Sequence, residues 1–227
     1  MHRGQSFDAV CFDCDSTLTR VEGIDELARR AGRGIEIAAL TETAMNGVVP
    51  LEAVYAKRLD LVRPDQVALA WLAERYVEEM VSGATETIAT LGRHGKAVCI
   101  VTSGLLQAVA AFARVLNLRP EQVHAVEVHL DARGTYRGYD SGSPLCCSDG
   151  KAIICRRIAA KHGKVAIVGD GVTDLAARAS GTFVVGYGGV VHREIMRQEA
   201  DCYITAPSLT ATLPALLSSS ATILGVN

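Results

Sequence analysis

Four aspartates at two points of the chain are the grouping best suited to chemistry. Asp13 and Asp15 directly follow the apolar run 9–12, and Asp170 and Asp174 lie in a Gly-Asp-Gly-Val-Thr-Asp segment after another apolar run. Carboxylates this close repel one another unless a cation or a shared proton lies between them. Clusters of oxygen ligands suit a hard cation, and Mg²⁺ is commonly bound by one or two carboxylates, water and substrate phosphate. The pattern therefore predicts a site for magnesium and phosphate.

A carboxylate that attacks phosphorus also needs donors to the phosphoryl oxygens, a positive charge and an acid for the leaving oxygen. The segment Thr102-Ser103-Gly104 follows the apolar run 97–101 and offers a hydroxyl and backbone amides to an anion. Lys151 follows Ser148-Asp149-Gly150 and can place a positive charge against nucleophile and phosphate. Each piece alone is usually a turn or a solvated surface, but their occurrence together favours phosphoryl transfer.

Seven cysteines offer a second kind of chemistry, which the sequence disfavours. Cys11 and Cys14 form a C-x-x-C, and Cys146 and Cys147 are adjacent. No second C-x-x-C completes a tetrahedral zinc set, and residues three apart on a strand face opposite ways. Most of the cysteines lie in apolar segments, where the side chain behaves as a small hydrophobe. The pattern indicates reduced thiols in a reducing compartment.

The elements that must position these residues alternate between strand and helix patterns. Apolar runs that end in polar residues predict strands of a parallel sheet at 9–12, 97–101, 165–168 and 182–185, the first of them central. Apolar spacings of three and four predict helices at 84–93, 107–116 and 152–161. This alternation is typical of a doubly wound, Rossmann-like α/β core, which binds ligands at the carboxyl ends of its strands.

The stretch 18–82 breaks the alternation. It is helix-like over the segments 24–31, 35–45, 51–61 and 64–81. We therefore expect a helical cap at 18–82, inserted into a catalytic core made of residues 1–17 and 83–227. The alternation over 125–139, around Ala132-Arg133-Gly134, predicts a small β-hairpin that leaves the sheet.

The motifs at 13–17, 102–104, 151 and 169–174 resemble, in order, the four motifs of haloacid dehalogenase superfamily phosphatases. The resemblance implies that Asp13 is the nucleophile and that Asp15 is the general acid that later activates water. It also implies that Mg²⁺ is bound by Asp13, Asp170 and the Asp15 backbone carbonyl. Thr102 would hold the phosphoryl group, and Lys151 would orient it and screen its charge. The last motif would add Thr173 as a substrate contact and Asp174 as a supporting residue.

Within that superfamily the chain is most similar to the phosphoserine phosphatase family, which acts in serine biosynthesis. The similarity rests on the segments 20–28, 44–50, 58–59, 185–193 and 203–205. Phosphoserine carries an ammonium and a carboxylate beyond its phosphate, so a selective site needs one group of each opposite charge. The resemblance implies that Glu22 meets the amine and Arg58 the carboxylate. Met45 and Leu51 would shield the pocket, and Ser103 and Gly104 would line its phosphate end.

Several departures leave the substrate open. The chain has Thr102-Ser103-Gly104 where the family usually has Ser-Gly-Gly, and Leu51 where it usually has Phe. The segment 144–148 also looks unlike the corresponding part of the family. An apolar wall altered by a few methylenes discriminates by only ~1–3 kcal/mol. The alternatives are a phosphatase for another small phosphorylated alcohol, a phosphotransferase to an alcohol such as homoserine, and a non-catalytic phosphate-ligand sensor.

The composition of the chain limits the kinds of partner that we expect it to bind. With 23 basic and 25 acidic residues the formal charge is −2, and aromatic residues make up 5% of the chain. Neither property favours a nucleic-acid surface. The first residues are too polar for a signal peptide, and no apolar run reaches the ~20 residues of a membrane span. We expect a cytoplasmic enzyme, monomeric or homodimeric, whose partner is a small phosphorylated metabolite.

Overall fold

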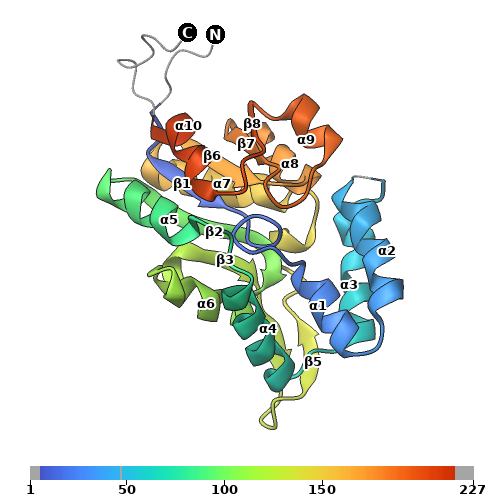
Figure 1. Cartoon of the computed structure of the whole chain (residues 1–227). Coiled ribbons are helices and arrows are strands. Elements are labelled where there is room, and N and C mark those ends of the chain that lie inside the picture. The colour runs from blue at the N-terminus through green and yellow to red at the C-terminus, as the bar shows by residue number, and fades with distance from the viewer. Residues whose placement is uncertain (1–5, 47, 218–227) are drawn as a thin grey trace.

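A six-stranded parallel sheet forms the centre of the protein (Figure 1). The computed structural model describes residues 6–46 and 48–217. Within them the strand order β3-β2-β1-β6-β7-β8 confirms the predicted doubly wound α/β core. The strands span Ala9–Phe12 (β1), Ala97–Leu105 (β2), Val123–Val126 (β3), Val165–Gly169 (β6), Phe183–Tyr187 (β7) and Cys202–Ile204 (β8).

The strand order changes direction at β1, the predicted central strand. Phe12 pairs with Ile100 of β2 and with Val168 of β6, so the end of β1 is held on both sides. The Asp13 N–H donates to the Val168 carbonyl at 2.9 Å and continues the ladder by one residue. Asp13, the last part of β2 and Asp170 therefore meet at one edge of the sheet, where doubly wound folds bind their ligands.

Two strands were not predicted from the sequence. Strand β3 and strand β8 are short and lie at the two edges of the sheet, and half of β3 and all of β8 are only partly buried. The predicted hairpin at 125–139 began too early, because its first residues belong to β3. The hairpin itself consists of Val128–Leu130 (β4) and Tyr136–Tyr139 (β5), which pair antiparallel and project beyond the sheet (Figure 1).

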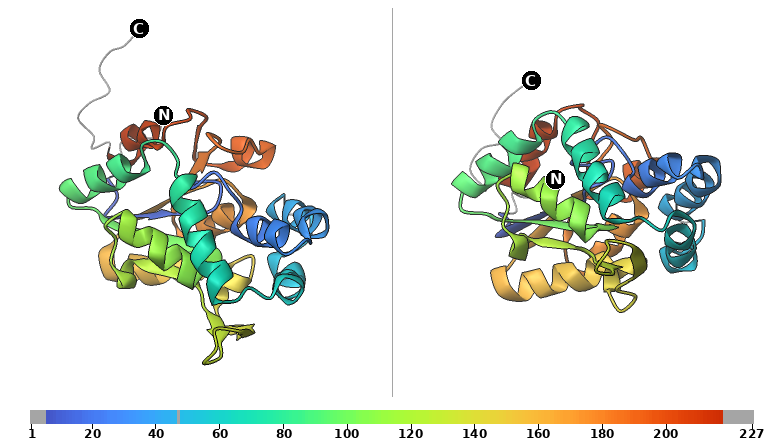
Figure 2. Two further views of the ribbon diagram at one scale, coloured as in Figure 1. Left: turned by 60° about the horizontal axis from the view of Figure 1, so that its bottom comes forward. Right: turned by 90° about the horizontal axis from the view of Figure 1, so that it is seen from below.

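Helices cover both faces of the sheet (Figure 2). The helices α5 (Ala84–Arg93) and α6 (Leu106–Val115) contact β2 from one face, and α7 (Gly150–His162) packs on β1, β2 and β6 from the other. The short helix α8 (Val172–Ala176) packs beside α7, α9 (Glu194–Glu199) packs on α8 and α10 (Leu213–Leu217) packs on α5. No described helix combines the length and the apolar composition that a bilayer crossing requires.

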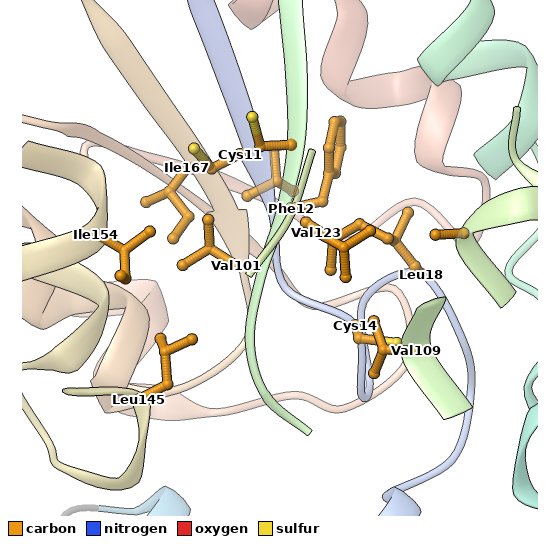
Figure 3. Packing of buried hydrophobic residues seen from close by; sticks show 14 of the residues in the cluster. Cys11, Phe12, Cys14, Leu18, Val101, Val109, Val123, Leu145, Ile154 and Ile167 are labelled. Carbon is orange, nitrogen blue, oxygen red and sulfur yellow. The ribbon is translucent and has the colours of Figure 1, made fainter. Parts of the chain in front are cut away.

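The core is built on strands that are buried on both faces. Every residue of β1 and of β6 is buried, as expected for parallel strands between two helical layers. Figure 3 shows Cys11 and Cys14 well apart in this packing. Both are free, fully buried thiols, which agrees with the interpretation of these cysteines as core residues.

Four helices lie where the cap was predicted. The helices α1 (Gly23–Arg30), α2 (Gly34–Met45) and α3 (Leu51–Val62) gather beside the sheet edge (Figure 1), whereas α4 (Gln66–Glu78) packs against core helix α6. The rings of Tyr76 on α4 and Phe112 on α6 are 5.7 Å apart between centroids. Helix α4 is shorter than predicted, because Asp65 caps its start and Met80 bridges to Thr19. We keep 18–82 as the proposed cap, with α4 as the part seated on the core.

Gly150 at the start of α7 provides a test of this packing. A Cβ there would lie 2.0 Å from the Pro144 carbonyl oxygen, so Gly150→Ala must displace backbone. We expect a loss of about 1–3 kcal/mol in the free energy of unfolding, measured by thermal denaturation. Gly92→Ala in α5 is the control, since a Cβ there meets no atom within 4 Å and alanine favours a helix by ~0.5–1 kcal/mol. Equal melting temperatures for the two variants would contradict the packing.

Candidate active site

A buried lysine joins two carboxylates at the carboxyl edge of the sheet. The Lys151 Nζ lies 2.7 Å from Asp13 Oδ2 and 2.6 Å from Asp174 Oδ1, and Lys151 is 2% exposed. Burial alone would lower the pKa of Lys151, but the two carboxylates outweigh burial and raise it. The ammonium is therefore held charged, and a buried charge is tolerated because it is paired on two sides.

Local structure sets this arrangement. Asp13 follows β1 and its Oδ1 accepts the Cys14 N–H at 2.8 Å, which leaves Oδ2 for Lys151. Asp174 lies in the first turn of α8, and its Oδ2 accepts the Gly171 N–H at 3.1 Å. A Cβ at Gly169 would lie 2.1 Å from the Asp174 carboxyl carbon. Only glycine at 169 lets the Asp174 side chain reach Lys151.

The carboxylates form a set suited to a divalent cation. Asp13, Asp170 and Asp174 each offer an oxygen, and these oxygens lie within 4.8 Å of one another. Burial raises the pKa of Asp170 to about 7, and the charges of Glu22 and Asp13 act in the same direction. Both oxygens of Asp13 and both of Asp174 already contact an N–H donor or the Lys151 ammonium, whereas the contact described for Asp170 is that of Oδ2 with Arg193. An all-oxygen set under mutual repulsion fits a hard cation.

Asp15 has the environment of a proton-transfer group. Its Oδ2 accepts the Gly23 N–H at 3.0 Å, and its Oδ1 is buried without a hydrogen-bond partner in the described part of the chain. Burial raises the pKa of Asp15 to about 7, the Tyr76 hydroxyl opposes the rise, and the charge of Asp13 adds to it. A carboxyl that titrates near neutral pH can donate a proton in one step and accept one in the next.

One pocket joins these groups to the cap. Thr102 is 1% exposed and its Oγ1 accepts the Gly104 N–H at 3.1 Å, in the last part of β2 where its pairing with β3 shifts register. The lining residues that were predicted from the sequence are Asp13, Asp15, Glu22, Arg58, Thr102, Ser103, Gly104, Lys151, Asp170 and Thr173. The pocket therefore collects groups from all four motifs and from the cap.

The pocket is also lined by one acidic and one basic side chain from the predicted cap, Glu22 and Arg58. The Ser16 hydroxyl donates to Glu22 Oε1 at 2.8 Å. Burial raises the pKa of Glu22 to about 8, and the charge of Asp15 adds to this effect. Arg58 is 5% exposed, and its Nη1 donates to Thr41 Oγ1 at 3.2 Å. Groups of opposite charge thus line the same pocket as the four sequence motifs.

Two predicted pocket residues are not among the lining residues described. Leu51 is buried at 1% exposure, but its contribution near the site is its N–H, which donates to Ser148 Oγ at 2.9 Å. The Met45 side chain lies outside what the structure describes. The apolar lining comes from Ile24, Tyr55, Leu59 and Leu105. The shielding role of Met45 and Leu51 stays a prediction.

Three further side chains act on the site and were not predicted. The Tyr55 hydroxyl donates to the Ser103 carbonyl at 2.7 Å, and Arg193 Nε donates to Asp170 Oδ2 at 3.0 Å. Tyr76 lines the pocket beside Asp15. Tyr55 lies three residues before Arg58 and so shares its helix face, a signal that was available in the sequence. Tyr76 lies near the end of α4, and nothing in the sequence sets it apart.

Comparison with known proteins shows the family to which the chain is related. The family model of haloacid dehalogenase-like hydrolases matches residues 7–181. A phosphoserine phosphatase of Bos taurus is 33% identical over 202 residues, which cover 88% of this chain and 90% of the bovine protein. A substrate-bound phosphoserine phosphatase structure has a TM-score of 0.79 at 26% identity and covers 93% of this chain and 99% of that one. A phospho-aspartyl intermediate analogue of phosphoserine phosphatase has a TM-score of 0.77 at 26% identity, with coverage of 93% and 100%.

Removing the buried ammonium should destabilise the site. Lys151→Met leaves Asp13 and Asp174 facing each other without a cation, and breaking a buried pair costs about 3–5 kcal/mol. We expect a corresponding fall in the free energy of unfolding, measured by chemical denaturation of the metal-free protein. Lys161→Met is the matched control, because Lys161 is exposed in the last turn of the same helix. A Lys151→Met protein as stable as this control would contradict the proposed pairing.

The raised carboxyl pKa values predict how stability depends on pH. Asp15, Glu22 and Asp170 bind protons more tightly when folded than when unfolded, with pKa values of about 7, 8 and 7 against ordinary values of 3.8 to 4.5. The folded state therefore holds more protons, and stability falls as pH rises through this window. We expect the melting temperature of metal-free protein to decline from pH 5 to pH 8.

Two additions sharpen this measurement. Glu22→Gln should flatten the decline, because one of the raised carboxyls is gone. Magnesium should raise the melting temperature more at pH 8 than at pH 5.5, because deprotonated carboxylates bind the cation. A melting temperature that increases with pH over this range would show that the cluster is not repulsive.

Proposed function

The chain belongs to the haloacid dehalogenase-like hydrolase family, and we propose that it is a magnesium-dependent phosphatase that converts L-phosphoserine to L-serine and phosphate. The observation that carries the proposal is that a single pocket is lined by two sets of groups. Asp13, Lys151 and Asp170 would handle phosphate, and Glu22 and Arg58, which line the same pocket, offer opposite charges to the rest of the substrate. Relatives named phosphoserine phosphatase, similar over most of the chain, support the same substrate.

The first step forms a bond between Asp13 and phosphorus. A carboxylate oxygen of Asp13 attacks the phosphorus atom, and the bond from phosphorus to the serine oxygen breaks. Asp15, protonated near neutral pH, gives its proton to that leaving oxygen. Lys151 holds Asp13 in place through its 2.7 Å contact and presents its positive charge to the phosphoryl oxygens.

The second step returns the enzyme to its starting state. Asp15, now a carboxylate, takes a proton from a water molecule that attacks phosphorus, and the bond to Asp13 breaks. Asp13 and Asp170 would hold the magnesium ion, together with the Asp15 backbone carbonyl. The ion, when bound, supplies positive charge that lowers the repulsion between these carboxylates and the phosphate. Asp174 keeps Lys151 aligned in both steps.

In this proposal, substrate specificity comes from the pocket residues that the cap supplies. In the proposed complex Arg58 meets the substrate carboxylate and Glu22 meets the ammonium, each as a pair of opposite charges. Ile24, Leu59 and Leu105 supply apolar walls around the short serine carbon chain. A substrate that lacks either charged group leaves a buried protein group unpaired, which is a stronger basis for rejection than size alone.

Contacts between cap and core support a lid role for the helical insert. Tyr55 on α3 donates to the Ser103 carbonyl of the core, and Leu51 at the start of α3 donates to Ser148. Arg193 donates to Asp170 and to Asn46 Oδ1, at 3.0 and 3.3 Å. These contacts hold the cap over the pocket, where exclusion of bulk water strengthens the electrostatic interactions. We propose that the enzyme acts in serine biosynthesis, in the cytoplasm, without a nucleic-acid or membrane partner.

A panel of phosphomonoesters tests the proposal. We expect L-phosphoserine to exceed phosphothreonine, phosphoethanolamine and glycerol phosphate by at least about a hundredfold in kcat/KM. Each of these esters either lacks a charged group that Glu22 or Arg58 would bind or adds bulk beside them. Phosphate release with magnesium and with excess chelator should differ by more than about a hundredfold.

Variants and products separate the remaining outcomes. Asp13→Asn should abolish phosphate release, whereas Asp149→Asn, an exposed aspartate near Lys151, should not change it. If another ester surpasses phosphoserine a hundredfold, the substrate is wrong while the hydrolase chemistry stands. If phosphohomoserine forms when homoserine is added, the enzyme is a transferase.

A further inference from the structure

One buried hydroxyl connects two charged residues of the cap. Thr41 on α2 is 3% exposed, and its Oγ1 donates to Asp25 Oδ1 at 2.7 Å. The same Oγ1 accepts the Nη1–H of Arg58 at 3.2 Å. Asp25 lies in the first turn of α1 and Arg58 lies on α3. A single side chain thus joins the three cap helices at the end of the pocket where Arg58 lies.

The direction of this chain of hydrogen bonds is fixed by chemistry. A guanidinium has only donors, an ionised carboxylate has only acceptors, and a hydroxyl has one proton with two lone pairs. Arg58 must therefore donate a hydrogen bond to Thr41, and the Thr41 hydroxyl must donate one to Asp25. Each bond polarises the next, since a hydroxyl that donates to a carboxylate becomes a better acceptor.

The rest of the guanidinium is left available. Arg58 Nε is buried and has no hydrogen-bond partner among the described residues, and no carboxylate in residues 6–46 or 48–217 forms an ion pair with this side chain. The guanidinium stacks on one neighbour, with its carbon 5.7 Å from the centroid of the Tyr55 ring. A buried arginine with free donors that faces a pocket is prepared for an anionic ligand.

We propose that Thr41 and Asp25 are positioning residues that set Arg58 for the substrate carboxylate. The inference rests on the proposed function and goes beyond it, because it identifies what aims the specificity-determining arginine. A direct pair between Asp25 and Arg58 would occupy the guanidinium fork and compete with the ligand. The intervening hydroxyl uses one N–H, anchors the arginine against α1 and α2, and leaves the other donors for a carboxylate.

The proposal makes a prediction about which substrates respond. Phosphoserine uses Arg58, whereas phosphoethanolamine has the same amine and phosphate but no carboxylate. Thr41→Val removes the hydroxyl at nearly constant shape. We expect it to lower kcat/KM for L-phosphoserine about tenfold, the scale of one hydrogen bond, with most of the change in KM. The kcat/KM for phosphoethanolamine should stay within about twofold of the parent enzyme.

Matched variants keep the test decisive. Thr41→Ser retains the hydroxyl and should restore selectivity for phosphoserine. Thr41→Ala, which leaves room for water beside Asp25, repeats the measurement if the valine variant melts below the assay temperature. In an Arg58→Ala background Thr41→Val should have no further effect on phosphoserine, because the group that Thr41 positions is gone.

The failures of this inference and of the proposed function are distinguishable. If the parent enzyme does not prefer phosphoserine to phosphoethanolamine, the proposed function fails. If it prefers phosphoserine but Thr41→Val slows both esters equally, or adds fully to Arg58→Ala, then Thr41 is only a structural residue of the cap and the inference is overturned.

Discussion

The buried Lys151 ammonium, held between Asp13 and Asp174, is the constraint on which the rest of the site depends. A lone buried charge costs too much free energy to persist, so the fold must place Lys151, Asp13 and Asp174 in contact with one another. Asp13 comes from the end of β1, Lys151 from the first turn of α7 and Asp174 from the first turn of α8. The registers of β1 with β6 and β2, and the close fit at Gly169 and Gly150, follow from the need to bring these elements to one point.

The same pocket carries more negative charge than its lysine can balance. Asp15, Glu22 and Asp170 have raised pKa values because they are buried near one another and near Asp13. Without a cation such a cluster either holds protons or is destabilised, and the magnesium ion and substrate ammonium that we propose to bind here would relieve both states. The buried carboxylates are therefore the source both of the repulsion in the pocket and of its proposed chemistry. The positive charges of Lys151, Arg58 and Arg193 offset part of this negative charge and so keep the carboxylates together.

The sequence was most informative where function depends on short stretches of chain. The strands that end at the site are buried on both faces, so their continuous apolar runs could be recognised, and the residues that follow them could be placed at one sheet edge. The edge strands β3 and β8 are half-buried and lack such runs. The links of Tyr55 to Ser103 and of Thr41 to Asp25 and Arg58 join residues 16 to 48 positions apart. Such links depend on how helices pack, which no local pattern encodes.

At two departures of the chain from the phosphoserine phosphatase pattern, Ser103 and Leu51, the backbone makes the described contact. Ser103 gives its carbonyl to the Tyr55 hydroxyl, a bond that any residue at 103 can accept. Leu51 gives its N–H to Ser148 and is not among the described pocket residues, so replacing an aromatic ring at 51 need not alter the pocket wall. Thr102 keeps the hydroxyl that accepts the Gly104 N–H. Positions 51 and 103, where main-chain atoms make the contact, tolerate side-chain change, while Asp13, Lys151 and Arg58, which would act through their own charges, leave no such freedom.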